Sequence, residues 1–225
     1  MKKAVWLILL ALPVLYINGQ RSADYGITGG VTSYIGDINP GKLLYSVMPA
    51  AGIFYRYNLH PRQALRMNFL AGGLSGSDLD FPNTFQQSRA GFFSGSVAEW
   101  STMFEFNFFP YHTQGKRWKS TPYLAAGAGI VFINTVVFTY TPVIPFSAGF
   151  KLNIYNNLGL EVEYGFRKTF YDNFDGLKDF VDPAEHGWLH NNDWYTYTGV
   201  SFTWKIYNKL AGCPVYNDVI MKRKH

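Results

Sequence analysis

The run from Trp194 to Tyr207 (WYTYTGVSFTWKIY) constrains the fold of this chain more than any other segment. One face of the run, from Trp194 to Ile206, is apolar and aromatic, and the other, from Tyr195 to Lys205, is mostly polar. Successive side chains of a β-strand point to opposite sides, so the run predicts a strand with one apolar face. Soluble strands usually have about 5–6 residues, whereas a tilted strand needs about 9–11 to cross a bilayer. The length therefore favours a strand of an outer-membrane β-barrel, which is built from a series of such runs.

Further strand-like runs recur along the chain, and together they predict an all-β fold. We expect an eight-stranded antiparallel transmembrane outer-membrane β-barrel, the smallest size in this class. An aromatic content of 18% with 16% charged residues fits a surface that faces lipid. The facing of the fifth strand stays open, because it is rich in Gly and Ala. The expected strands are 25–37, 47–58, 64–74, 92–109, 122–133, 143–155, 158–170 and 194–207.

The first residues have the pattern of a secretory signal peptide, residues 1–19. A basic start at Lys2 and Lys3 precedes an apolar stretch that Pro13 interrupts, and this stretch is shorter than the roughly 20 residues of a membrane helix. We therefore expect export with cleavage, a barrel over residues 20–207 and a periplasmic C-terminal tail over residues 208–225. Export also argues against a nucleic-acid partner, although the net charge is +5.

The lengths of the connections predict how the barrel is oriented. Connections after the second and sixth strands are short and the one after the fourth is moderate. Those after the third and seventh are long, and those after the first and fifth are intermediate. Outer-membrane barrels have short periplasmic turns and longer outer loops. We therefore expect residues 75–91 and 171–193 outside a Gram-negative cell, and residues 58–63, 110–120 and both termini in the periplasm.

The polar faces of the strands collect charged residues of both signs. A barrel of eight strands is only wide enough to be filled by its own side chains, and buried charges must pair. This favours a structural ion network over a transport lane or paired catalytic carboxylates. Glu161, Glu163 and Arg167, on one strand, are expected to pair across the barrel with Arg56, Arg66 or Lys205. The predicted network consists of Arg56, Arg66, Glu99, Glu105, Lys151, Glu161, Glu163, Arg167 and Lys205.

The sequence offers little for catalysis. It contains no G-x-S-x-G or H-E-x-x-H motif. His186 and His190 have the spacing of one helix face, but Pro183 and Gly187 argue against a helix that would align them with the nearby carboxylates of 182–193. We expect no catalytic residue, no metal, no cofactor and no small-molecule substrate.

The tail holds the one cysteine, Cys213, together with enough apolar residues to be buried by a partner. An odd cysteine in an exported protein is either a buried thiol or one that faces a partner. The tail is therefore a candidate docking element through Cys213, Pro214 and Tyr216. The alternative is a disordered stub with an idle thiol.

Several short motifs, in this order and spacing, resemble those of one family. They are Tyr34-Ile35-Gly36-Asp37-Ile38-Asn39-Pro40, Tyr55-Arg56-Tyr57-Asn58, Glu105-Phe106-Asn107-Phe108-Phe109, Thr121-Pro122-Tyr123-Leu124, Asn192-Asp193-Trp194-Tyr195 and Cys213-Pro214. The chain resembles the PorG-type outer-membrane proteins of the Bacteroidetes type IX secretion system. The resemblance implies a non-enzymatic protein, embedded in outer-membrane lipids, that anchors the periplasmic ring of the PorK lipoprotein and PorN.

Two other classes stay open on the sequence alone. An OmpA- or OmpX-like barrel would act in adhesion or envelope integrity through its outer loops. A lipid-A-modifying barrel enzyme would need a serine with a placed histidine, and none of the expected strands carries such a pair.

Overall fold

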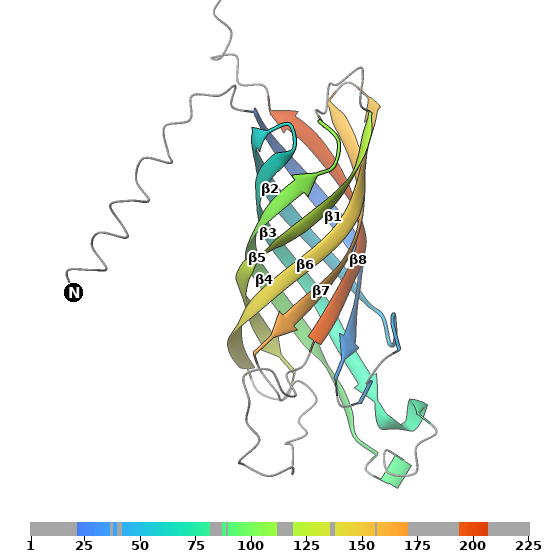
Figure 1. The fold of residues 1–225 in the computed structure, drawn as a ribbon. Helices are drawn as coiled ribbons and strands as arrows, with labels where there is room; N and C mark the ends of the chain where they lie inside the picture. The colour runs from blue at the N-terminus through green and yellow to red at the C-terminus, as the bar shows by residue number, and fades with distance from the viewer. Residues whose placement is uncertain are drawn as a thin grey trace, which may run out of the picture.

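The chain folds into one closed β-barrel of eight antiparallel strands that follow one another in sequence order around the barrel (Figure 1). The computed structural model describes residues 22–36, 38–39, 42–81, 87–88, 90–111, 119–135, 138–155, 157–170 and 194–206. The barrel closes through pairing of β1 with β8. This confirms the predicted fold class. The strands are β1 (Ser22–Ile35), β2 (Met48–His60), β3 (Gln63–Ser77), β4 (Phe92–Asn107), β5 (Ser120–Asn134), β6 (Phe138–Tyr155), β7 (Leu158–Thr169) and β8 (Trp194–Ile206).

Alternation of polar and apolar residues sets which side of each strand faces the lumen. In β4, Glu99 and Glu105 are buried inside the barrel, whereas Trp100 and Phe104 between them are exposed on its outer surface. The same alternation holds in the other strands and confirms the predicted facings. It also settles β5, in which Tyr123 points inward.

Two strands, β3 and β6, lengthen most beyond their predicted bounds. β3 continues to Ser77 and leads into a short 3-10 helix, η2 (Asp78–Asp80). β6 begins at Phe138 rather than at Val143. Its two prolines, Pro142 and Pro145, lie inside the strand because the fixed φ of proline is compatible with extended backbone, at the cost of ladder hydrogen bonds. The connection between β5 and β6 is consequently short, not intermediate as predicted.

The two ends of the barrel differ, and we name them by what they carry. β1 begins and β8 ends at the terminal end, where β2–β3 and β6–β7 are joined by short turns (Figure 1). The opposite, loop end carries the β1–β2, β3–β4 and β7–β8 connections, which are longer than these turns, and the short β5–β6 connection. There the β3–β4 hairpin, with η2 at its tip, projects beyond its neighbours. In the part of the chain that the structure describes, no helix is long and apolar enough to cross a membrane.

Candidate functional site

The polar side chains of the strands meet in the lumen, where the charged groups form one connected network of ion pairs. In each of these pairs the exposed fraction of either side chain is at most 4%. Buried charges of this kind are stable only when they are paired and hydrogen-bonded. The network comprises Asp24, Arg56, Arg66, Glu99, Glu105, Lys151, Glu161, Glu163 and Arg167.

Glu105 on β4 is the centre of this network. Its carboxylate lies 2.7 Å from Nε of Arg56, 3.1 Å from Nε of Arg66 and 2.5 Å from Nζ of Lys151. Arg56 and Arg66 occupy directly opposite positions of β2 and β3, where like charges repel. Glu105 contacts both guanidinium groups, so it offsets the repulsion that the register creates.

The carboxylates of β7 complete the pairing from across the lumen. Glu161 receives two parallel hydrogen bonds from Arg56, of 2.7 and 2.6 Å, which is the strong bidentate geometry. Glu163 lies 2.7 Å from Nη1 of Arg66 and 3.4 Å from Nη2 of Arg167, and Nε of Arg167 lies 3.3 Å from Glu99. The structure thus places Glu161 beside Arg56 and Glu163 beside Arg66.

Hydroxyl groups outside the predicted network add further hydrogen bonds to its carboxylates. Tyr123 donates to Glu163 over 2.8 Å and Tyr195 donates to Glu99 over 2.6 Å. Thr203 donates to Glu161 over 3.0 Å. β5 and β8 therefore join the network through neutral donors. The sequence could have indicated these three residues through their inward-facing positions on the strands, since a buried Tyr hydroxyl usually has a hydrogen-bond partner.

The terminal end of the network differs from the prediction at two residues. Asp24, which was missed because β1 was expected to begin at Tyr25, lies 3.7 Å from Arg56 and accepts a hydrogen bond of 2.9 Å from Asn58. Lys205, which was included, lies opposite Asp24 in the β1–β8 register but is partly exposed, and it makes no ion pair with the described residues. Its position at the end of β8 explains this, because a long flexible amine there reaches water.

Glycines provide the space in which the long side chains cross the lumen. A Cβ atom at Gly165 would collide with Nη1 of Arg167 and with Oγ of Ser147. A Cβ atom at Gly149 would lie 2.6 Å from the ring of Tyr123. The inward glycines therefore belong to the packing of the network.

Packed side chains close the loop end of the lumen, and one buried tyrosine lies at its terminal end. At the loop end, Asn39 in the β1–β2 connection donates to the carbonyl groups of Tyr34 and Lys42 over 2.8 and 2.7 Å and holds Ile38 over the barrel. At the terminal end, the hydroxyl of Tyr111 reaches Gly159 of β7, and burial raises the pKa of this tyrosine. The loop-end plug consists of Tyr34, Ile38, Leu74, Phe81, Phe93, Val97, Val131, Ile133, Val143 and Tyr195.

This arrangement holds charges in place and leaves little for catalysis among the described residues. The one histidine among them, His60, is exposed beside the β2–β3 turn, away from the lumenal serines. The described residues contain no group of three or more His, Cys, Asp or Glu side chains that could hold a metal ion. The candidate partner residues Cys213, Pro214 and Tyr216, and the acidic and histidine residues of 182–193, lie outside the described residues.

The fold defines the class: a small, closed eight-stranded β-barrel with a polar, filled lumen and an apolar outer surface. Neisserial surface protein A is similar in structure, with a TM-score of 0.50 and 8% identity over 84% of this chain and 98% of that one. Ail of Yersinia pestis is also similar, with a TM-score of 0.47 and 12% identity over 84% of this chain and all of that one. No curated protein matches the chain.

A family model, described as a domain of unknown function (DUF6089), matches residues 2–215. The chain belongs to this family.

Proposed function

We propose that this protein is a non-enzymatic outer-membrane component of the type IX protein secretion machinery, which anchors the periplasmic PorK–PorN ring to the membrane. The proposal combines three supports: an outer surface suited to lipid, a lumen filled by its own side chains, and the resemblance of the sequence to PorG-type proteins.

The outer surface supports insertion in the outer membrane. Large apolar side chains such as Ile53, Phe69, Trp100 and Phe150 are exposed on the outside of the barrel, each by more than 45% of its surface. In water such a surface would cause aggregation, whereas in a bilayer it contacts the acyl chains of the lipids. The longer connections at the loop end support an orientation with this end outside the cell and both termini in the periplasm.

The filled lumen is the observation that carries the choice of an anchor. Glu105 and its three cations cross the terminal-end half of the lumen, and packed side chains form a plug at its loop end. A barrel built in this way offers no aqueous path for a substrate. Its function is therefore assigned to the parts that lie outside the lumen.

The motifs that carry the family resemblance divide into several within the barrel and one that follows its last strand in sequence. Ile38 belongs to the loop-end plug and Asn39 beside it is completely buried, whereas Glu105 belongs to the ion network and Tyr123 donates to it. These residues have sufficient structural reasons to be present. The tail motif Cys213-Pro214 follows the last strand instead, so we assign ring docking to residues 208–225 and in particular to Cys213, Pro214 and Tyr216.

Truncation of the tail tests the proposal. A chain that ends at Lys209 keeps all eight strands and should insert normally, but it should lose co-purification of PorK and PorN from detergent-solubilised outer membranes and lose type IX secretion. A chain that ends at Met221 removes only the basic end and serves as the matched control. Normal ring co-purification and secretion with the Lys209 truncation would refute docking through the tail.

A second candidate is an adhesion barrel that acts through its outer loops. It is favoured by the projecting β3–β4 hairpin, on which Leu79 and Phe92 are exposed by 65% and 80%. Replacing residues 78–91 with a short turn should abolish adhesion if the protein is an adhesion barrel. If it is the ring anchor, the same replacement should leave secretion unchanged.

An unaltered lipid-A mass spectrum in a strain without the protein would count against a lipid-modifying enzyme.

A further inference from the structure

One charged side chain interrupts the apolar outer surface of the barrel. Within the eight described strands, every other charged residue occupies an inward-facing position, and Lys168 on β7 is the one that faces outward. A charge on the lipid-facing side destabilises a barrel by an amount that falls towards the membrane interfaces. Lys168 lies next to Thr169, the last residue of β7 at the loop end, so its position is at an interface.

The ammonium group of Lys168 is held by an aromatic ring and not by a carboxylate. Its Nζ lies 5.2 Å from the ring centroid of Trp194, the residue opposite it on β8. No ion pair joins it to another described residue. Tryptophan at a membrane interface marks the level of the lipid headgroups, so the charge is presented where phosphate groups lie.

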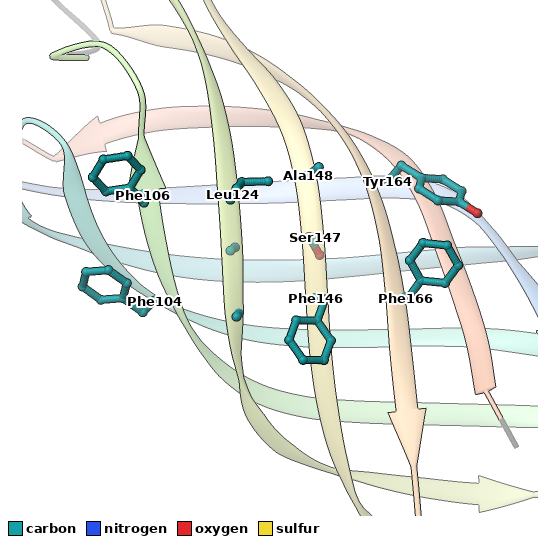
Figure 2. Close-up of a pocket in the computed structure, with 10 residues that line it drawn as sticks. Phe104, Phe106, Leu124, Phe146, Ser147, Ala148, Tyr164 and Phe166 are labelled. Atoms are coloured by element: carbon teal, nitrogen blue, oxygen red, sulfur yellow. The ribbon is translucent and has the colours of Figure 1, made fainter. Parts of the chain in front are cut away.

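An apolar groove lies on the same outer surface, and its lining includes Phe166, two residues before Lys168 on β7. Its volume is about 430 Å³, within the range of about 300–1,000 Å³ that is usual for ligand pockets. Cross-strand pairing sets two rows of side chains over β4 to β7: Phe104, Ala126, Phe146 and Phe166 in one, and Phe106, Leu124, Ala148 and Tyr164 in the other. Ala126 and Ala148 are small members of these rows and leave room between the larger side chains. Figure 2 shows Ala148 between Leu124 and Tyr164, with the rings of Phe104 and Phe106 on one side and that of Phe166 on the other.

The groove runs obliquely from the loop end into the membrane. Phe166 is close to Thr169, at the loop end of β7, whereas Phe104 in the same row is close to Asn107, at the terminal end of β4. Phe166 and Lys168 lie on the same face of β7, about 6.6 Å apart along the strand. A molecule with its charged group at Lys168 can therefore extend its apolar part along the groove.

The dimensions of the groove select the kind of occupant. Phe104 and Phe146, which flank Ala126, stand two strand spacings apart, or about 9.6 Å between backbones, and their rings narrow the gap further. An α-helix with its side chains is about 10–12 Å wide and does not fit between them. A single hydrocarbon chain fits, and it requires no hydrogen-bond partner from these apolar walls.

We propose that Lys168, Trp194 and this groove form a binding site for one phosphorylated, acylated lipid of the leaflet at the loop end. Lys168 binds the phosphate beside the ring of Trp194, and one acyl chain lies over Ala148 and Ala126. This inference rests on the proposed insertion in the outer membrane, but it is independent of ring anchoring and of the tail.

Titration of the purified full chain in detergent with lipid A, followed by native mass spectrometry, tests the site. The barrel should retain one lipid A molecule, and Lys168→Gln should weaken its binding about five-fold, the effect expected for one lysine at a lipid surface. Dephosphorylated lipid A should bind the unchanged barrel as weakly as lipid A binds Lys168→Gln. The control is Lys205→Gln, which removes an inward-facing lysine and should leave binding unchanged.

Filling the groove tests the acyl chain separately. Ala148→Phe should abolish retention of the lipid, whereas Ala51→Phe, on the outer face of β2, should not. Ala126→Leu provides a second, smaller obstruction if Ala148→Phe does not fold, as judged by the heat-dependent gel mobility of the barrel. Equal lipid binding by Lys168→Gln and Lys205→Gln, or by the obstructed and control barrels, would overturn the site. A chain that fails to insert into vesicles would instead overturn the membrane placement.

Discussion

Replacing Glu105 with glutamine should be the most destabilising single change in the lumen. The side chain is 0% exposed and contacts three cations, Arg56, Arg66 and Lys151. Both arginines keep a second carboxylate, but Lys151 has no other ion-pair partner among the described residues. Breaking a buried pair by removing one partner costs about 3–5 kcal/mol, mostly because a buried charge is left uncompensated.

Urea unfolding of the barrel in detergent micelles, followed by the mobility of unheated samples on gels, measures this cost. Glu105→Gln should lower the free energy of unfolding by about 3–5 kcal/mol. Adding Lys151→Met removes the stranded charge, so the double variant should recover about 1–3 kcal/mol, in the range of coupling energies between contacting residues. Gln63→Ala, on the exposed start of β3, is the control and should stay within about 0.5 kcal/mol. If Glu105→Gln destabilised the barrel no more than Gln63→Ala does, the central role of Glu105 would be refuted. The same would follow if adding Lys151→Met gave no recovery.

Three further predictions follow from other parts of the barrel. Burial and the hydrogen bond to Asp80 raise the pKa of Tyr45 from 10.0 to about 12. The stability that this hydroxyl gives to the packing of the β1–β2 connection is therefore complete below pH 10 and is lost as the pH rises through 12. The difference in tyrosinate absorbance between the unchanged chain and Tyr45→Phe should show this late titration, and completion near pH 10 would contradict it. Gly165→Ala should destabilise the barrel by about 1–3 kcal/mol because the new methyl group displaces the guanidinium of Arg167, whereas Gly29→Ala, where a Cβ atom meets nothing within 4 Å, should be far milder in the same urea assay. In a Cys213→Ser background, a membrane-impermeant thiol reagent on intact cells should label Leu79→Cys at the loop end and miss His60→Cys at the terminal end; the reverse pattern would overturn the orientation.

Alternation along the strands made the inward residues predictable, but their partners depend on the closed barrel. Strand parity allowed four glutamates to be placed inside, because they lie on the face opposite to the aromatic and aliphatic side chains of the same strand: Glu99, Glu105, Glu161 and Glu163. Which cation each one meets depends on the stagger of the strands around the barrel, and no local pattern encodes that stagger. The bidentate contact of Arg56 with Glu161, for example, joins residues on β2 and β7.

The errors arose where local signals were weak or misleading. β6 was expected to begin at residue 143, but it begins at Phe138 and contains Pro142 as well as Pro145. The facing of β5 could not be predicted because Ala125 and Ala126 suit either side, and only closure of the barrel decides between them. Asp24 and Lys205 lie at strand ends, where boundaries are least certain and exposure changes over one residue. The burial of Ile38 and Asn39 depends on a loop that folds back over the barrel.

Conductance across planar lipid bilayers tests the central claim, that the barrel is filled and acts as an anchor. The purified full chain, with insertion verified by its heat-dependent gel mobility, should produce no channel openings above the background of the bilayer. The paired charges around Glu105 and the loop-end plug occupy the lumen, so we expect no continuous path for ions. Stable, reproducible single-channel steps from the unchanged chain would contradict the account and indicate a transport protein.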